Sequence, residues 1–350
     1  MSVAIRPADL SDLREQARLR AWIDAQPDAT PFHLPEWSIA VARGCRQTSR
    51  YLVAETADGA IAGVLPLTEI ASPLFGRALV SAGFGVGGGI LAGSAAVVAP
   101  LAEAAWDLAV RLRCPSLDLR GGPSPGEGWH RDDTTYVGFA RALAADDAAE
   151  LQAVPRKQRA ELRKALAADL AIETGSDAAM RRAHRAVYGE SVRNLGTPVF
   201  PATLFSAVLE AFGPEADILT VRYQGAAVAS VLSLYWRGTV YPYWGGGTDA
   251  ARGLRANDRM YFALMAHARA RGCTRFDFGR SKLGTGAAAF KKNWGFVAEP
   301  MVYYSRHAEG AAPRSINPLD PKYRLQIAAW KRLPLWAANR VGPIIARGLG

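Results

Sequence analysis

A segment of the first half of the chain recurs in the second half, and this repeat constrains the fold more than any single residue. Cys114-Pro-Ser-Leu-Asp118-Leu-Arg-Gly is followed 159 residues later by Cys273-Thr-Arg-Phe-Asp277-Phe-Gly-Arg, with cysteine and aspartate in step. Both copies show the order hairpin, glycine-rich strand, helix and aspartate-bearing strand. A solenoid is excluded because solenoid periods are roughly 20–50 residues. The chain is therefore predicted to contain one unit twice.

The predicted elements place the chain in the α/β (α+β) class. Short strands alternate with amphipathic helices, a pattern that mixed sheets with helices on their faces can bury. We expect two tandem domains, each a mixed, mostly antiparallel sheet flanked by helices, at 1–150 and 151–310, and a basic, aromatic tail at 311–350. The expected helices are 10–26, 31–43, 95–113, 155–168, 177–193, 201–212, 256–271 and 286–293, and the expected strands are 51–54, 61–68, 79–91, 116–120, 217–223, 227–236, 239–244, one at Asp277 and one near 297–305.

Charge is distributed unequally between the two units. Residues 1–150 contain 13 arginines and 18 acidic residues, a net charge of −5, and the remainder carries +15. The second unit is therefore where an anionic ligand would be attracted, although a basic surface that only aids solubility is the alternative. Three widely spaced cysteines and the lack of an apolar N-terminal run predict a cytoplasmic protein without a signal peptide. Cys114 and Cys273, just before buried strands, are expected in the core.

Two familiar site types find little support. Gly83-Phe-Gly85-Val-Gly-Gly88 matches the dinucleotide-binding fingerprint, but it follows an antiparallel hairpin rather than the first strand of a βαβ unit. The five histidines show no ligand spacing and no cysteine or carboxylate cluster accompanies them, so no metal is expected. We therefore predict no permanently bound cofactor.

The strongest candidate site follows the second aspartate strand. Alternation places Phe276 and Phe278 on one face of this strand and Asp277 on the other. The strand is expected to end at Gly279, which would release Arg280 and Lys282 into a loop. This concentration of polar and cationic groups after one buried strand favours a functional site.

A basic helix is expected to complete this site. A Gly-Thr-Gly turn leads into the helix at 286–293, which carries Lys291 and Lys292, and a helix N-terminus attracts anions. In a purely structural interpretation, Asp277 anchors a loop and the lysines are solvated. In the first copy, glycines and a linker follow Asp118, so we interpret that unit as degenerate and as shaping the substrate groove.

Further candidate binding residues lie outside this run. Pro242 cannot donate to a sheet ladder and predicts an edge or a bulge in its strand, whose freed N–H groups could polarise a donor carbonyl. Tyr243 and Trp244 are expected to line an acceptor groove. Arg159 lies on the basic face of the helix at 155–168, and Arg193 follows Ser191-Val.

The ending Phe290-Lys-Lys-Asn-Trp-Gly-Phe and the order of elements resemble the GNAT acyltransferase fold, whose fourth helix often ends in Tyr-x-x-x-Gly-Phe. Two such domains in tandem resemble the FemABX peptidyltransferase-like family. Four runs more closely resemble the FemAB-related proteins of PEP-CTERM/exosortase systems: Ser191-Val-Arg-Asn-Leu-Gly-Thr-Pro-Val-Phe, Pro242-Tyr-Trp-Gly-Gly, Phe276-Asp-Phe-Gly-Arg-Ser-Lys and Asn317-Pro-Leu-Asp-Pro-Lys-Tyr.

This resemblance implies transfer of an acyl or aminoacyl group to an amine in the synthesis of the cell envelope or an exopolysaccharide. GNAT proteins take the group from acyl-CoA and FemABX proteins from aminoacyl-tRNA. The stretch Arg252-Gly-Leu-Arg-Ala-Asn departs from the GNAT pyrophosphate loop, which leaves the donor open. Lys291 stands where many GNAT enzymes place a general-acid tyrosine, and it could protonate a leaving group with a lowered pKa.

The roles then follow from this chemistry. An amine attacks only when neutral, so Asp277 would act as a base or orienting group. Arg280, Lys282 and Lys292, with Arg159 and Arg193, would bind phosphates or other substrate groups. The alternative function is a non-catalytic tandem module that binds an anionic lipid-linked glycan or RNA.

The basic tail bears on partners and location. Aromatic and aliphatic residues alternate there with lysines and arginines, so the tail either lies on a membrane surface or packs on its own domain. The expected partners are an acyl donor and an amine acceptor, either lipid-linked or a sugar, with tRNA as a further partner. The expected location is the cytoplasm, with the inner face of the membrane as the alternative.

Overall fold

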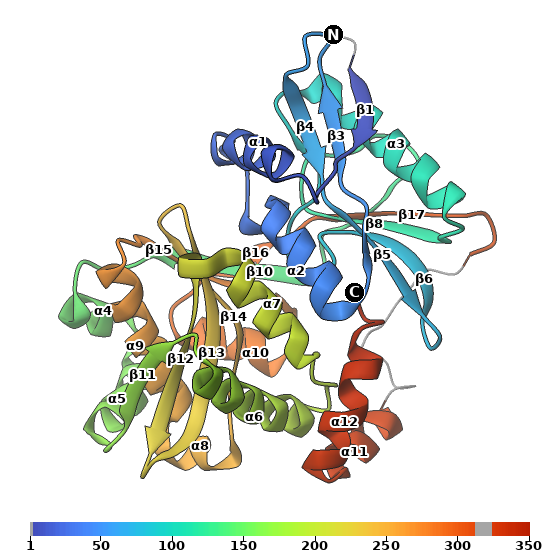
Figure 1. Ribbon diagram of the computed structural model, residues 1–350. Helices are drawn as coiled ribbons and strands as arrows, with labels where there is room; N and C mark the ends of the chain where they lie inside the picture. The colour runs from blue at the N-terminus through green and yellow to red at the C-terminus, as the bar shows by residue number, and fades with distance from the viewer. Residues whose placement is uncertain (1–2, 312–323) are drawn as a thin grey trace.

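Two groups of strands divide the structure, and Figure 1 shows them in separate halves that meet at helices α2 (Pro35–Cys45) and α7 (Ala202–Phe212). This computed structural model describes residues 3–311 and 324–350. The second half is built on one seven-stranded sheet in the order β11-β12-β13-β14-β15-β10-β16. Its strands are β11 (Ala171–Gly175), β12 (Ala216–Tyr223), β13 (Ala226–Trp236), β14 (Thr239–Gly247), β15 (Arg275–Lys282), β10 (Tyr136–Ala142) and β16 (Glu299–Pro300).

Helices cover both faces of this sheet. Helix α6 lies along β13 and β14 on one face together with α7, and α9 lies along β12 and β13 with α5 outside it. Their apolar sides form the buried clusters that contact the sheet, as amphipathic helices do. The helices of this half are α4 (Asp147–Ala153), α5 (Arg156–Ala167), α6 (Ala178–Leu195), α7 (Ala202–Phe212), α8 (Asp249–Leu254), α9 (Ala256–Ala270) and α10 (Gly286–Asn293).

The first half contains a four-stranded sheet, β1-β3-β4-β7, and a six-stranded sheet, β2-β5-β6-β8-β17-β9. Pro66 separates β4 from β5, so one extended segment passes from the first sheet into the second. The strands are β1 (Ala4–Pro7), β3 (Leu52–Glu55), β4 (Ile61–Leu65), β7 (Leu91–Ala92), β2 (Thr48–Ser49), β5 (Leu67–Ser72), β6 (Gly76–Ser81), β8 (Ser116–Arg120), β17 (Tyr303–His307) and β9 (His130–Asp132), and the helices are α1 (Leu13–Asp24), α2 (Pro35–Cys45) and α3 (Val98–Arg111).

The repeat predicted from sequence corresponds to a repeated pair of parallel strands. In the first half β6 pairs parallel to β8, with Leu79 opposite Leu117. In the second half β14 pairs parallel to β15, with Val240 opposite Phe276. Every other strand pair in the described residues is antiparallel. Each aspartate strand is therefore the parallel neighbour of the glycine-rich strand before it, in both copies.

The two halves exchange strands, which the sequence did not indicate. Strand β10 precedes the expected boundary at residue 150, yet it pairs with β15 in the second half. Strand β17 follows all helices of the second half, yet it pairs with β8 and β9 in the first, as Figure 1 shows. The expected strand near 297–305 is thus two strands, β16 and β17, in different sheets. The two-domain division stays a prediction, and sheet membership crosses its boundary.

A shared apolar core joins the halves. Trp37 of α2 stacks on Trp244 of β14, with ring centroids 5.9 Å apart. Helix α2 crosses α7 so closely that a Cβ atom at Gly44 would collide with the backbone of Leu204, and the Thr203 hydroxyl donates to the Gly44 carbonyl at 2.7 Å. Because burial of apolar surface drives such association, this shared core stabilises the contact between the halves.

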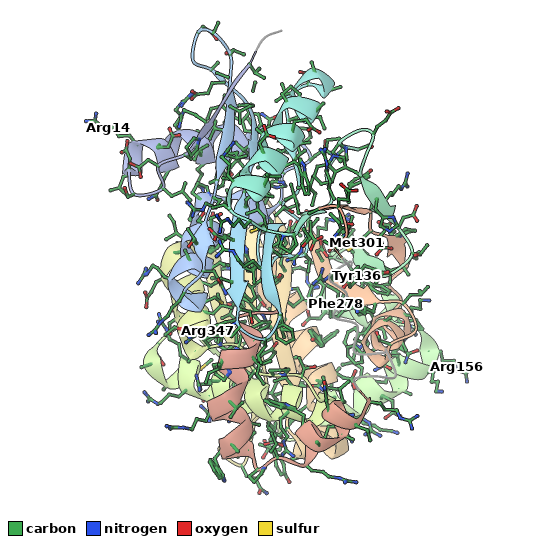
Figure 2. All side chains as sticks on the ribbon, turned by 90° about the vertical axis from the view of Figure 1, so that its right-hand side faces the viewer. Arg14, Tyr136, Arg156, Phe278, Met301 and Arg347 are labelled. Carbon is green, nitrogen blue, oxygen red and sulfur yellow. The ribbon has the colours of Figure 1, made fainter. Side chains whose placement is uncertain are left out.

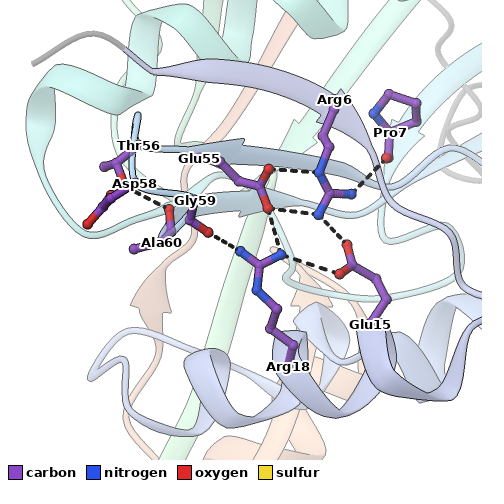
Figure 3. A network of polar contacts seen from close by, with 9 residues as sticks. All are labelled: Arg6, Pro7, Glu15, Arg18, Glu55, Thr56, Asp58, Gly59 and Ala60. Carbon is purple, nitrogen blue, oxygen red and sulfur yellow. Dashed lines mark hydrogen bonds and ion pairs between the residues drawn. The ribbon is translucent and has the colours of Figure 1, made fainter.

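The far end of the first half carries a network of charged side chains, drawn in Figure 3. Arg6 of β1 donates to both carboxylate oxygens of Glu55 on β3, at 2.8 and 2.7 Å, and to Glu15 of α1 at 2.7 Å. Arg18 of α1 also contacts Glu55 at 2.6 Å. These ion pairs hold the N-terminal strand and helix together.

The C-terminal segment forms two short helices, α11 (Arg324–Arg332) and α12 (Leu335–Ala346), which contact α6. The Asn317–Tyr323 run lies outside the described residues. Within the described residues, no helix has the length and apolar character needed to cross a bilayer.

Candidate active site

The site lies where β14 and β15 separate. The two strands pair at only two positions, Thr239 with Arg275 and Val240 with Phe276. Beyond them β14 is irregular, because Leu232 of β13 pairs with Trp244 whereas Ser233 pairs with Pro242, so that Tyr243 is an extra residue in a bulge. The irregularity predicted at Pro242 is thereby confirmed.

Asp277 stabilises a second bulge, in β15. The pairing of β15 with β10 shifts between Gly138 and Ala140, and Gly279 has a positive φ of 65° there. The Asp277 carboxylate accepts a hydrogen bond from the Gly279 amide at 2.7 Å. Burial raises the pKa of Asp277, and the Gly279 hydrogen bond and the charges of Arg275 and Lys291 oppose this shift. A carboxylate with a raised pKa can accept a proton.

Lys291 reaches back from α10 to the same bulge. Its ammonium donates to three successive carbonyls, those of Phe278 at 2.7 Å, Gly279 at 3.2 Å and Arg280 at 3.0 Å. Burial lowers the pKa of Lys291 to about 8, while the nearby charge of Asp277 acts in the opposite direction. Asp277 and Lys291 thus bind the amide and the carbonyls of one bulge. In this arrangement all three donors of the ammonium are in use.

Arg280 and Lys282 lie within β15, not in a loop. The sequence placed the strand end at Gly279, but pairing with β10 continues to Lys282 because Tyr136 lies opposite that residue. Both cations lie over the Tyr136 ring, with Arg280 Cζ 4.6 Å and Lys282 Nζ 5.6 Å from its centroid. Tyr136, labelled in Figure 2, accepts a hydrogen bond at its carbonyl from the Met301 amide at 3.0 Å. Arg280 also donates to the Tyr303 hydroxyl at 3.0 Å.

The glycine-rich loop of the first half is a structural link. Its four successive carbonyls at Gly83, Phe84, Gly85 and Val86 each accept a hydrogen bond from a different side chain. In that order, the donors are Trp37 Nε1 at 3.1 Å, the Tyr243 hydroxyl, Arg120 Nη1 at 2.8 Å and the Tyr303 hydroxyl at 2.6 Å. A dinucleotide loop offers amides to phosphate, whereas this loop uses its carbonyls to bind both halves.

The two predicted groove aromatics lie mainly in the shared core. Trp244 is 4% exposed and contacts Trp37 and Phe205. Tyr243 is partly exposed, and its ring contacts those of Phe32 and Trp37. Of the two, only Tyr243 keeps partly exposed surface in this conformation.

Three predicted binding residues lie away from this centre. Arg159 binds the turn before its own helix, donating to the carbonyls of Val154 at 3.1 Å and Gln152 at 2.8 Å. Arg193 donates to the Lys331 carbonyl at 3.1 Å, at the contact between α6 and α11. Lys292 is exposed in the last turn of α10. Lys291 and Lys292 therefore lie at the C-terminal end of α10. The sequence had suggested one anion site formed by these lysines and the helix N-terminus, but the two are at opposite ends of the helix.

The region before α9, where a GNAT fold would bind pyrophosphate, has its own ion pair. Arg255 adopts a left-handed backbone conformation between α8 and α9, and its guanidinium pairs with Glu161 of α5 at 2.5 Å. The Asn257 side-chain oxygen next to it is buried and accepts no hydrogen bond from the described residues. The positive charge of Arg255, which could otherwise face a phosphate, is thus already neutralised by Glu161.

The sequence analysis missed three residues at the centre: Arg120, Tyr136 and Tyr303. The sequence could have indicated Arg120 as a site residue, because Arg120 follows Asp118 within the repeated strand. Tyr136 and Tyr303 had none, since both come from the strands that the halves exchange. Among the described residues, no group of three or more histidines, cysteines, aspartates or glutamates could hold a metal. Cys114 and Cys273 are buried, as predicted.

Comparison with known proteins identifies the fold. Residues 152–292 match the family model described as an acetyltransferase (GNAT) domain. No curated protein matches the chain. A crystal structure of FemX is 14% identical with a TM-score of 0.65, covering 89% of this chain and 98% of that one.

Two further solved structures agree. A tandem GNAT protein from the clavulanic acid biosynthesis pathway is 15% identical, with a TM-score of 0.55 over 89% of this chain and 100% of that one. The C-terminal domain of a putative lysylphosphatidylglycerol synthetase from Agrobacterium fabrum is 12% identical, with a TM-score of 0.56 over 86% and 93%. The predicted fold class, tandem GNAT-like units with mixed sheets flanked by helices, is confirmed, and the family model matches within the second unit.

Proposed function

We propose that this protein transfers an acyl or aminoacyl group onto an amine acceptor at the separation of β14 and β15. The observation that carries the proposal is the pair of facing bulges in these strands, one at Tyr243 and one at Gly279. The second bulge binds both a carboxylate of raised pKa and an ammonium of lowered pKa, whose charges act on each other. Such opposed shifts in one site are typical of acid–base pairs.

Asp277 accepts a proton from the attacking amine, whose nitrogen then forms the new bond to the donor carbonyl carbon. As the carbonyl carbon releases its thiol or tRNA hydroxyl, Lys291 supplies the proton to the leaving group and exchanges one of its three carbonyl contacts to do so. Backbone amides at the Tyr243 bulge polarise the carbonyl. Arg280 and Lys282 hold anionic groups of the substrates, and Lys292, Arg159 and Arg193 are peripheral binding residues at most.

The donor is either acyl-CoA or aminoacyl-tRNA. The neutralised arginine before α9 and the departure from a pyrophosphate loop weigh against a tightly held CoA pyrophosphate. The acceptor is an amine on a lipid-linked or sugar-bearing envelope precursor, and PEP-CTERM/exosortase-associated exopolysaccharide synthesis is the context that the sequence runs favour.

The test supplies purified protein with an amine-bearing acceptor and either acetyl-CoA or charged tRNA. Turnover releases free thiol in the first arm or deacylates tRNA in the second, and in both cases only when the acceptor is present. A non-catalytic module that binds an anionic glycan or RNA predicts binding to these ligands with no acceptor-dependent release in either arm.

We also propose that α11 and α12 contact an anionic membrane surface. Leu325, Trp336 and Ile344 are 81%, 73% and 65% exposed. Trp336, Arg340 and Ile344 follow one another at four-residue spacing, so they share a face of α12. Residues 324–350 contain five basic and no acidic residues. Exposed apolar groups among cations complement the interface of an anionic bilayer.

A further inference from the structure

Two arginines from different sheets lie together at the junction of the halves. Arg120 of β8 is directly opposite Tyr303 of β17 in register, so their side chains lie on the same face of that sheet. Arg280 of β15 donates to the Tyr303 hydroxyl at 3.0 Å. Tyr303 therefore connects the two guanidiniums, and each arginine comes from one copy of the repeated strand.

Contacts to the glycine-rich loop confirm this convergence. Arg120 Nη1, the Tyr243 hydroxyl and the Tyr303 hydroxyl donate to three successive carbonyls of the loop. The charges of Arg120 and Arg280 also both act on Tyr243. Both guanidiniums thus lie near the same two tyrosine hydroxyls, those of Tyr243 and Tyr303.

The two guanidiniums differ in their electrostatic surroundings: against the effect of burial, Tyr303, Tyr136 and Tyr243 raise the pKa of Arg280. Burial, and next the positive charge of Arg280, lower the pKa of Arg120. Neither arginine forms an ion pair with an aspartate or glutamate side chain among the described residues. Two partly desolvated like charges cost stability unless a counter-charge binds between them.

Donors remain for such an anion. Arg120 is 8% exposed, whereas Arg280 is more accessible, so an anion from solvent meets Arg280 before Arg120. Arg120 Nη2 donates to the main-chain oxygen of Gly350, the last residue of the chain, at 2.7 Å, and an anion oxygen would replace that oxygen. The amides of Val86 and Gly87 donate no hydrogen bond within the described part of the chain.

We propose that Arg120 and Arg280 form an anion site built by both halves, which holds a phosphate or carboxylate group of the acceptor. Binding of the anion stands on the geometry alone, and only its assignment to the acceptor rests on the proposed function. In this arrangement the first unit supplies a binding residue, so its aspartate strand has a role beyond shaping a groove.

Calorimetric titration of the full chain with inorganic pyrophosphate and with acetate tests this site. Saturable binding of pyrophosphate identifies a phosphate site, and saturable binding of acetate a carboxylate site. Arg280→Gln and Arg120→Gln should each weaken the binding roughly tenfold or more, because each removes a charge-assisted hydrogen-bond donor. Arg306→Gln, a control on β17 whose partner is Glu103, should bind as the unmodified chain does.

Several outcomes would overturn the site: no saturable binding of either anion, unchanged binding in folded Arg280→Gln, or an equal loss in the Arg306 control. Should Arg120→Gln fail to fold, Arg280→Gln and Arg280→Lys decide the matter, because Arg280 is partly exposed. Transfer measured on the same preparations separates the two proposals. If the protein catalyses transfer but does not bind the anions, only the anion site is contradicted. If it binds the anions but does not catalyse transfer, only the proposed function is contradicted.

Discussion

The hydroxyl of Tyr243, in the bulge of β14, donates a hydrogen bond to the carbonyl of Phe84 in the glycine-rich loop of the other half. Tyr243 is the extra residue of the bulge at the candidate site, so its hydrogen bond connects this bulge to the first half. Since Arg120 and Tyr303 bind the next two carbonyls, the loop sets the position of three site residues at once. The site is a property of the junction and not of the second unit alone.

Tyr243→Phe should lower the free energy of unfolding by about 1 kcal/mol, because it leaves a partly buried carbonyl without its donor. Urea denaturation measures this change. The control is Tyr223→Phe, because within the described part of the chain the Tyr223 hydroxyl has one hydrogen bond, accepted from the Gln224 amide at 3.4 Å. Its free energy of unfolding should be nearly unchanged. Equal values for the two variants would contradict the link between the halves.

Asp277→Asn should abolish transfer and leave the fold intact. Asparagine keeps an oxygen that can accept the Gly279 amide hydrogen bond, but it cannot take a proton from an amine. Acceptor-dependent thiol or tRNA release gives the activity, and circular dichroism confirms the fold. Full activity in this variant would remove Asp277 from the mechanism.

Lys291→Met should destabilise the protein by roughly 2 kcal/mol, because the carbonyls of Phe278, Gly279 and Arg280 lose their shared donor. Lys292→Met, one residue along the same helix and exposed, should change the free energy of unfolding by less than about 0.5 kcal/mol. Denaturant titration of both variants decides between a bound and a solvated Lys291.

The pH dependence of transfer follows from the same lysine. Its pKa is lowered to about 8, so the ammonium that serves as proton donor is present below that pH and is lost as pH rises through it. We expect kcat/KM to fall above about pH 8. A rate that rises through this range would show that Lys291 is not the acid.

Glu55→Gln should destabilise the first half by about 1 kcal/mol at pH 7. The hydrogen bond from Arg6, with Arg18 adding to it, lowers the pKa of Glu55 to about 2. Because this folded-state pKa lies below the unfolded value, the stabilisation is complete above about pH 4.5 and disappears as pH falls toward 2. Urea denaturation at pH 7 and pH 3 checks this, with Glu103→Gln as the exposed ion-pair control.

Replacing Trp336 and Ile344 together by serine should reduce binding to vesicles that contain phosphatidylglycerol roughly tenfold or more, because two apolar side chains no longer enter the bilayer. Co-sedimentation measures the bound fraction, and pure phosphatidylcholine vesicles should bind weakly. Leu13→Ser on α1 is the control, since Leu13 is equally exposed, at 75%, but far along the chain. Undiminished binding of the double variant would place the contact elsewhere.

Patterns within short stretches of sequence were sufficient to predict the duplicated unit, most helices and the strand that carries Asp277. They were sufficient because periodicity and turn chemistry are local properties. Strand β10 was missed and β17 was assigned to the wrong sheet, because pairing partners far apart in the chain leave no local signal. For the same reason Arg280 was expected in a loop, although β10 continues the pairing past it.

The chemical groups of the site could thus be named from residue types, but their roles depend on tertiary contacts. Only packing decides that Lys291 binds three carbonyls, that Trp244 is in the core and that Arg120 meets Arg280 across two sheets. Burial and neighbouring charge shift pKa values and set which donors are free, and both arise when distant segments come together. The repeat indicated two similar units, and the strands that they exchange make one site between them.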